Sequence, residues 1–217
     1  MRFGCCGSMI SPESDPLGAA IVEEAAGLGF DYIELSLRDV AVLSEADYRD
    51  LGRRLRSAGL PCEACNNFFP PAVRLTGRRA DRSAGVAFGT RALERAAGLG
   101  ARTVVFGSSA ARNVPEGFGA DEAFSQLAGL LAGLGPRAAA LGIVLAVEPL
   151  RRQESNIINR LGDAQLAGDP MSEGRLQIVF LELSGYAREH FADEAQLMRD
   201  AGLGPRHIDA HTRHHHQ

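Results

Sequence analysis

The sequence lacks any long apolar run. No stretch approaches the roughly 18 consecutive apolar residues of a transmembrane helix, and the first residues lack the basic segment and long apolar core of a signal peptide. We therefore expect a soluble, cytoplasmic protein that has no membrane partner.

The sequence also lacks an excess of positive charge. It has 23 Lys and Arg residues against 27 Asp and Glu residues, which gives a net charge of -4. Proteins that bind duplex nucleic acid usually carry a basic surface, so we expect no nucleic-acid partner, although a local basic patch stays open. No Pro/Gly/Ser-rich or charged linker divides the 217 residues, so we predict a single domain over residues 1–217.

The cysteine patterns of a redox or zinc site are incomplete. Cys62 and Cys65 form a C-x-x-C in a segment that we expect to be a strand, where positions i and i+3 point to opposite faces. A zinc site that combines this pair with Cys5 and Cys6 lacks a second C-x-x-C or a regularly spaced histidine pair. We favour four ordinary thiols, without a disulfide, over both alternatives.

What the sequence does contain is a regular alternation of short apolar runs and longer helical patterns. The helical pattern is clearest over residues 121–141, and S-E-A-D at Ser44 predicts a helix N-cap. The predicted strands are residues 2–6, 31–35, 60–66, 102–106, 143–147, 176–183 and 207–210. The predicted helices are residues 17–29, 44–58, 81–99, 121–141, 161–167 and 193–201.

This alternation requires parallel strands joined by right-handed crossovers, because helices and not hairpin turns connect the strands. A closed (β/α)8 barrel and an open doubly wound sheet both fit. No G-x-G-x-x-G or G-x-x-x-x-G-K-[ST] follows an early strand, and units of near-uniform length end in polar groups. The predicted fold is therefore an α/β, TIM-type barrel in which seven strands are visible.

The most informative stretch is residues 141–159, LGIVLAVEPLRRQESNIIN, where an apolar strand stops at Glu148 and Pro149 prevents its ladder from continuing. A carboxylate at the C-terminal end of a core strand is where α/β folds place catalytic and ligand-binding groups. Glu154 and Asn156 follow closely. The alternative reading is a carboxylate that caps a helix or pairs with an arginine.

Other candidates lie at other strand ends. Asn66 ends the third predicted strand and is a candidate for substrate binding. Ser108 follows the fourth strand in F-G-S-S, a turn that either cradles a phosphate or serves only the chain's geometry. Cys5 at the end of the first strand either lines the pocket or is a buried small thiol.

Three segments together resemble the sugar-phosphate isomerase/epimerase family, which has a xylose isomerase-like TIM barrel. They are VEPLRRQESNIIN, EACNNFFP and VVFGSSAARNVPEGF, and the pattern of Glu148 in E-P-L followed six residues later by Glu154 is most similar to ketose 3-epimerases. The resemblance implies that Glu148 binds a divalent metal (Mn²⁺, Co²⁺ or Mg²⁺) and acts as the base, while Glu154 contacts sugar hydroxyls.

The sequence departs from the family pattern after Glu148. Where the family has a metal-binding Asp and then a His, this chain has Glu182 and Gly185, and its H-x-H is replaced by His207-Ile208-Asp209. The candidate metal ligands are therefore Glu148, Glu182 and Asp209, with His207 as a possible replacement. We find no eighth strand with the second catalytic Glu, and expect a C-terminally incomplete barrel whose open edges favour a homo-oligomer.

The resemblance implies a mechanism. The metal would hold a carbonyl and a neighbouring hydroxyl oxygen of a small sugar, a sugar phosphate or a cyclitol, and Glu148 would transfer the proton through an enediolate. Two alternatives stay open: a catalytically impaired or non-catalytic sugar-binding barrel and, less favoured, an endonuclease-type phosphodiesterase.

Overall fold

A computed structural model describes residues 2–168 of the chain. The chain divides into two compact units, Met1–Leu176 and Gln177–Gln217, and all described residues belong to the first. The strands predicted at residues 176–183 and 207–210, and the helix predicted at 193–201, lie outside the described residues.

The described part of the chain is built around a parallel sheet in the order β1-β2-β3-β4-β5. The strands are β1 (Gly4–Cys6), β2 (Tyr32–Ser36), β3 (Cys62–Asn66), β4 (Thr103–Phe106) and β5 (Val144–Val147). Each strand pairs with the next strand in the sequence, as five consecutive units of a barrel require. The five strand predictions in this region are confirmed, with ends that differ by at most two residues.

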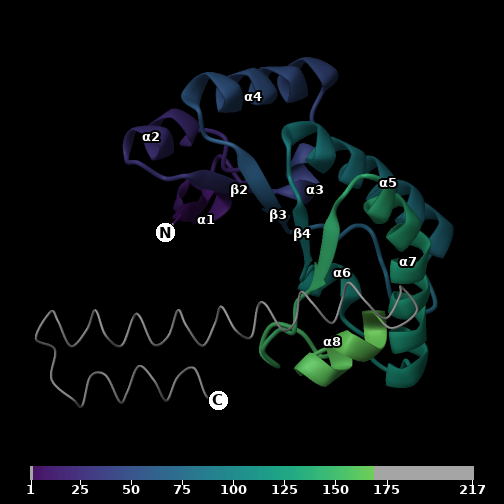
Figure 1. Ribbon diagram of the computed structural model, residues 1–217. Helices are drawn as coiled ribbons and strands as arrows, with labels where there is room; N and C mark the ends of the chain where they lie inside the picture. The colour runs from purple at the N-terminus through teal and green to yellow at the C-terminus, as the bar shows by residue number, and fades with distance from the viewer. Residues whose placement is uncertain (1, 169–217) are drawn as a thin grey trace, which may run out of the picture. The chain divides into compact units, whose positions relative to one another are not determined.

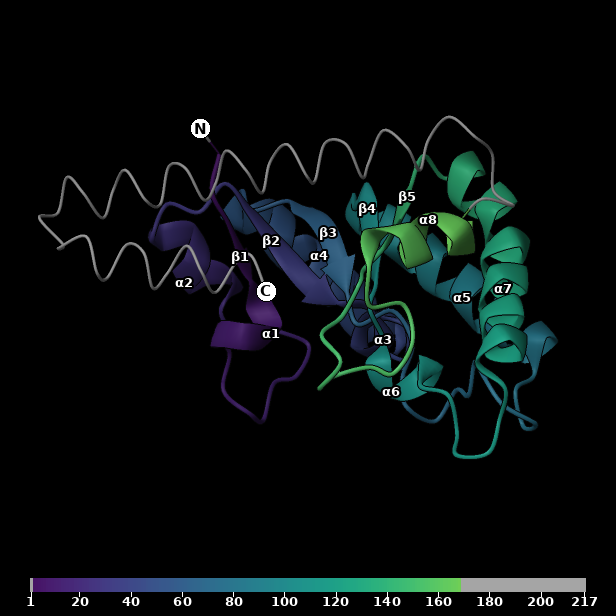
Figure 2. The same ribbon diagram turned by 90° about the horizontal axis from the view of Figure 1, so that it is seen from below.

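Helices connect the strands. They are α1 (Gly7–Ile10), α2 (Val22–Gly27), α3 (Leu37–Val40), α4 (Glu45–Ala58), α5 (Arg82–Leu99), α6 (Ser109–Arg112), α7 (Ala120–Ala140) and α8 (Leu161–Gly168). The longer helices α4, α5 and α7 lie on one face of the curved sheet, together with α2 (Figure 1). The one-turn helices α1, α3 and α6 directly follow β1, β2 and β4, so they mark the C-terminal edge of the sheet (Figure 2).

Helix α7 supplies much of the core. Leu127, Leu131, Leu134 and Ala138 are buried, as the spacing of apolar residues predicted. A Cβ on Gly89 of α5 would lie 2.7 Å from the side chain of Leu134, so α5 and α7 approach closely because this position has no side chain. Burial of each leucine contributes about 1.5–3 kcal/mol, which fixes α5 and α7 against the sheet.

The predicted N-cap of α4 is confirmed. Ser44 Oγ accepts a hydrogen bond of 3.1 Å from the backbone N–H of Asp47, and Gly59 ends the helix in the left-handed conformation. The prediction of a helix from residue 17 to residue 29 is wrong at its start, because α2 begins at Val22. Gly18 has a φ of +84° and packs against the backbone of Gly7, so residues 17–21 form a turn and not a helix.

The prediction that Cys62 and Cys65 point to opposite faces of β3 is also wrong. Both are fully buried, and their Sγ atoms lie 3.8 Å apart. The register explains this arrangement: Ile33 pairs with Cys62 and Glu34 with Ala64, so β3 contains one extra residue at a bulge. All four cysteines are free thiols.

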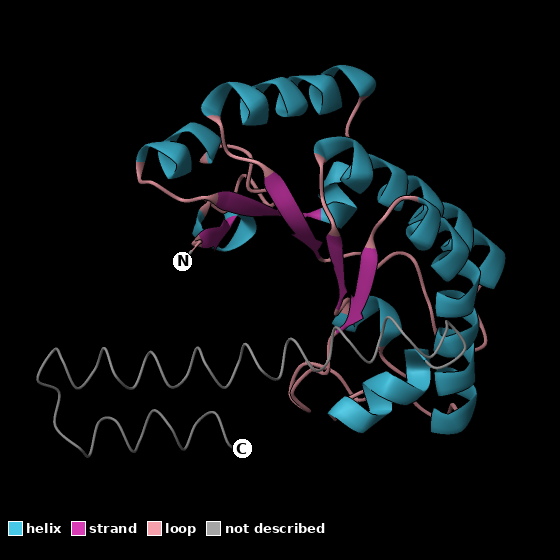
Figure 3. Cartoon of the chain, in the orientation of Figure 1, coloured by secondary structure: helices cyan, strands magenta, loops and turns pink. Residues whose placement is uncertain are grey.

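The loops that leave the C-terminal ends of the strands are drawn in pink in Figure 3. They bring together the polar side chains described next. Among the described residues no helix is long and apolar enough to cross a membrane.

Candidate functional site at the C-terminal edge of the sheet

Glu148 lies directly after β5, at the C-terminal edge of the sheet, as expected. Its backbone N–H donates to the carbonyl of Phe106 at the end of β4, over 3.2 Å, so the residue is still held by the ladder between the two strands. The residue as a whole is exposed, while the surrounding chain partly desolvates its carboxyl group. Glu148 is therefore a partly desolvated carboxylate on a rigid backbone support.

A buried arginine fixes the backbone around Glu148. Arg112 of α6 is fully buried and donates hydrogen bonds to the carbonyl oxygens of Phe106 (2.9 Å), Glu148 (2.8 Å) and Ile158 (3.4 Å). Its guanidinium also lies over the ring of Phe106, 5.7 Å from the centroid. Burial lowers the pKa of Arg112 to about 10, while the charge of Glu148 raises it. One side chain thus joins the end of β4, the end of β5 and the loop that follows β5.

A second carboxylate, Glu34 of β2, contributes to the same electrostatic environment. Burial raises the pKa of Glu34, and the charge of Glu148 raises it further, whereas a hydrogen bond with Asn66 lowers it. Asn66 is the last residue of β3, and its amide donates to the Sγ of Cys6 over 3.2 Å. Its Oδ1 is buried and has no partner within the described residues. Glu34 thus interacts with Asn66 and lies within electrostatic range of Glu148.

The pKa of Glu148 is raised, chiefly by burial of the carboxyl and further by the charge of Glu154, while Arg112 lowers it. A carboxylate with a raised pKa is a better proton acceptor than an ordinary one. Such perturbed groups are concentrated at functional sites, although buried ion networks also produce them.

Gly107 makes room for the Glu148 carboxylate. A Cβ added at Gly107 would lie 2.4 Å from Oε2 of Glu148, a distance that side chains do not adopt. Gly107 is the residue after β4, in the F-G-S-S turn, so the absence of a side chain there permits the orientation of Glu148. Ser108, the next residue, has a φ of +45°, and its Oγ accepts a hydrogen bond of 2.9 Å from the backbone N–H of Phe69. Ser108 thus holds the loop that follows β3.

The loop after β5 is tied to the loop after α6. Asn156 Oδ1 accepts from the N–H of Val114 (2.8 Å), and Asn113 Oδ1 accepts from Ser155 Oγ (2.8 Å). Glu154 is exposed and pairs with Arg151, which lowers the pKa of the Glu154 carboxyl. The roles of Asn156 and Glu154 toward a substrate stay predictions.

The remaining predicted site residues are placed as follows. Cys5 is buried in β1, and burial raises the pKa of its thiol. Glu182, His207 and Asp209 lie outside the described residues. Within residues 2–168, no group of three or more His, Cys, Asp or Glu side chains gathers to hold a metal ion.

Sequence analysis missed two residues of this site. Glu34 is a charged residue inside a short apolar strand, DYIEL. A carboxylate is rare in such a strand, so its presence could have indicated a functional residue. Arg112 gives no such signal, because nothing in its local sequence distinguishes it from the exposed arginines.

The comparisons with known proteins agree with this architecture. A sequence model of the xylose isomerase-like TIM barrel family matches residues 22–179, which is more than half of the chain. A search of curated proteins finds no match.

Solved structures show the same fold. A D-psicose 3-epimerase crystallised in the presence of D-fructose aligns with a TM-score of 0.68 and 22% identity over 81% of this chain and 61% of its own. A 3-keto-D-glucoside 4-epimerase from E. coli aligns with a TM-score of 0.63 and 20% identity over 78% and 64%. An AP endonuclease of family 2 from Brucella melitensis aligns with a TM-score of 0.60 and 17% identity over 80% and 66%. The chain thus spans less than two thirds of each of these neighbours.

Proposed function

Because the chain belongs to the xylose isomerase-like TIM barrel family, we propose that it is a sugar isomerase or epimerase in which Glu148 transfers the proton. The observation that carries the proposal is the placement of Glu148: a rigidly held carboxylate with a raised pKa at the C-terminal edge of the sheet. Two of the three structural neighbours named above are sugar epimerases, which supports the same reaction class.

In the proposed reaction Glu148 accepts a proton from the carbon next to the sugar carbonyl, which leaves an enediolate. Isomerisation then returns the proton to the former carbonyl carbon, whereas epimerisation needs a proton delivered to the opposite face of the first carbon. The raised pKa of the carboxyl matches this task, because it brings proton affinity closer to that needed near neutral pH. We assign Asn66, the last residue of β3, to a hydrogen bond with a sugar hydroxyl. We assign Glu154, on the same loop as Glu148, to further hydroxyl contacts.

We also propose a divalent metal, Mn²⁺, Co²⁺ or Mg²⁺, which when bound would polarise the sugar carbonyl. Its proposed ligands are Glu148, Glu182 and Asp209, with His207 as a replacement, and only Glu148 lies within the described residues. Hard cations such as Mg²⁺ and Mn²⁺ prefer carboxylate oxygens, so the carboxylate of Glu148 is a suitable ligand for the proposed metal.

The test is hydrogen–deuterium exchange into sugars. The full chain with Mn²⁺ is incubated in D₂O with D-fructose, D-psicose, D-tagatose or L-ribulose, and NMR detects deuterium at the carbon next to the carbonyl. We expect incorporation into at least one ketose, and its loss in Glu148→Gln. Exchange reports proton transfer directly, even where the product is not separated.

The matched control is Glu24→Gln, which neutralises an exposed carboxylate on α2. It should exchange like the wild type. Calorimetric titration with Mn²⁺ gives a second readout: Glu148→Gln should bind the metal more weakly by on the order of tenfold. Binding of a ketose without any exchange would instead support a non-catalytic sugar-binding barrel, and exchange that persists in Glu148→Gln would contradict the assignment of the base.

A further inference from the structure

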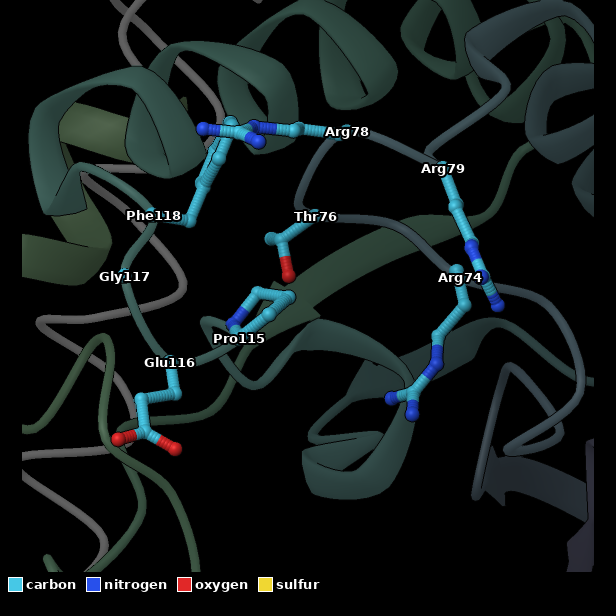
Figure 4. Close-up of a pocket in the computed structure, with 8 residues that line it drawn as sticks. All are labelled: Arg74, Thr76, Arg78, Arg79, Pro115, Glu116, Gly117 and Phe118. Atoms are coloured by element: carbon cyan, nitrogen blue, oxygen red, sulfur yellow. The ribbon is translucent and has the colours of Figure 1, made fainter.

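A pocket opens between the loop that follows β3 and the loop that precedes α7. It has a volume of about 560 Å³, and its lining is rich in arginine (Figure 4). The lining residues are Arg74, Thr76, Arg78, Arg79, Pro115, Glu116, Gly117 and Phe118. None of them belongs to the Glu148 site described above.

The charge of this pocket contrasts with that of the chain. The sequence has a net charge of -4 and contains no lysine, yet three arginines lie within six residues of one loop. Within residues 2–168, Arg78 and Arg79 form no side-chain hydrogen bond or ion pair, and Arg74 donates only to the carbonyl of Ala110, over 3.0 Å. The guanidinium groups are therefore not neutralised by carboxylates of the described chain, and only Glu116 among the lining residues is acidic.

The floor of the pocket is fixed. The Leu75 N–H donates to the carbonyl of Ala111 (3.0 Å), and Thr76 Oγ1 donates to the carbonyl of Asn113 (2.7 Å). The amide of Gln126 on α7 forms two hydrogen bonds with the backbone of Gly77, of 2.8 and 3.1 Å. A loop that is held on both sides loses little conformational entropy when a ligand binds.

Close packing also requires this loop conformation. Gly77 has a φ of +94°, and a Cβ added there would lie 2.6 Å from Pro115 on the opposite wall. The two walls of the pocket therefore contact each other at Gly77, which has no side chain. This contact fixes the backbone from which the neighbouring arginines extend.

The side chains are divided between two sides of the pocket. In Figure 4, Arg74 and Arg79 extend to the same side of the loop, whereas Arg78 extends toward the side where Phe118 lies. The Glu116 carboxylate points away from Arg74 and Arg79. Guanidinium groups bind phosphate oxygens through paired N–H donors, and two of them match the charge of one phosphate dianion.

We propose that this pocket binds the phosphoryl group of a small ligand, with Arg74 and Arg79 as the principal donors. The two sources of that chemistry are a phosphorylated sugar and free inorganic phosphate. The hydrogen bonds of Asn113 and Val114 with Ser155 and Asn156 connect the pocket wall to the loop that carries Glu154, which favours the phosphorylated sugar.

The test is calorimetric titration of the full chain with inorganic phosphate, D-fructose 6-phosphate and D-fructose. We expect inorganic phosphate and D-fructose 6-phosphate, the two phosphorylated probes, to bind more tightly than D-fructose. Their binding should weaken as the salt concentration rises. The variant Arg74→Gln/Arg79→Gln should weaken phosphate binding by on the order of tenfold or more. Tighter binding of D-fructose 6-phosphate than of phosphate supports the sugar as the source, and equal binding supports the free ion.

The control is Arg91→Gln, which removes an exposed arginine of α5 outside the pocket. It should bind phosphate like the wild type.

Arg79→Gln alone breaks no contact within the described residues, so it keeps the test valid if the double variant unfolds. No binding of either phosphorylated probe at millimolar concentration, or equal binding by wild type and Arg79→Gln, would overturn the proposal. Binding of a short oligonucleotide that outcompetes both small probes would overturn the assignment to a small ligand. The exchange assay with unphosphorylated ketoses tests the proposed reaction separately.

Discussion

Replacement of the buried Arg112 by methionine tests whether this side chain serves the site more than the stability of the fold. Arg112→Met keeps a long side chain in the core and removes the guanidinium. We expect the backbone around Glu148 to loosen, because all three carbonyls that the guanidinium contacts lie at the ends of β4 and β5 or in the following loop.

The magnitude follows from two opposing effects. Burial lowers the pKa of Arg112 from 12.5 to about 10. A base with a lowered pKa opposes folding while it is charged, so at neutral pH the guanidinium costs the folded state about 3 kcal/mol, a cost that fades only above pH 10. Its three hydrogen bonds, at about 1.5 kcal/mol or more each, stabilise the folded state by about 5 kcal/mol. The net loss of unfolding free energy in Arg112→Met is therefore about 2 kcal/mol.

Loss of Arg112 should affect the backbone near Glu148 more strongly than it affects the stability of the whole fold. The N–H groups of Glu148 and Leu150 donate to the carbonyls of Phe106 and Ile158, the same oxygens that Arg112 holds. In Arg112→Met both amides should exchange with solvent faster by on the order of tenfold, at a denaturant concentration where the chain stays folded.

Urea unfolding and amide hydrogen exchange measure the two effects. Arg91→Met is the control, because Arg91 is exposed on α5 and its replacement should change stability by about 0.5 kcal/mol or less. Unchanged protection of the Glu148 and Leu150 amides in Arg112→Met would refute the reasoning. So would a variant more stable than the wild type, since the hydrogen bonds would then not outweigh the desolvation of the charge.

Two further predictions concern Glu148. Gly107→Ala should displace the carboxylate of Glu148, since the new Cβ would lie 2.4 Å from Oε2, and lower the rate of deuterium exchange by about 100-fold while unfolding free energy changes by about 1 kcal/mol. Glu148→Gln should be more stable than the wild type at pH 7. The raised pKa means that the folded state favours the protonated carboxyl, so its stabilising effect is present below the ordinary pKa of 4.5 and is lost as pH rises through the folded value. The difference between the two proteins should therefore shrink as pH falls toward 4.5, measured by urea unfolding.

The controls for these variants lie on α2. Gly27→Ala adds a Cβ that meets nothing within 4 Å, so it should leave the exchange rate unchanged. Glu24→Gln removes an exposed carboxylate and should show no such pH-dependent gain in stability. A Glu148→Gln protein that is less stable than the wild type at pH 7 would mean that the carboxylate supports the fold.

The elements that the sequence predicted well are those with local causes. The helix over residues 121–141 follows from the spacing of its leucines, and the N-cap at Ser44 follows from S-E-A-D. Glu148 lies at the end of β5 because an apolar run stops there and Pro149 follows. Each prediction depended on residues within one or two turns of chain.

The features that the sequence did not predict depend on distant parts of the chain. The bulge in β3 that brings Cys62 and Cys65 to one side is a property of its pairing with β2. The start of α2 depends on the contact between Gly18 and Gly7. Neither contact leaves a periodic pattern, so propensity and spacing could not reveal it.

Within the described residues, groups whose own placement carries an energetic cost gather at the C-terminal edge of the sheet. Arg112 is a fully buried charge, Glu148 is a carboxylate with a raised pKa, and Ser108 adopts a positive φ. The hydrogen bonds of Arg112 outweigh the desolvation of its charge, so Arg112 stabilises the fold through the three carbonyls that it holds at this edge. The raised pKa of Glu148 brings no such gain, and a fold under pressure for stability alone has no reason to retain that carboxylate beside Arg112. Their coincidence with the end of β5 is what a site held in a defined geometry requires, and the loop bonded to Asn113 extends that geometry to the arginine pocket.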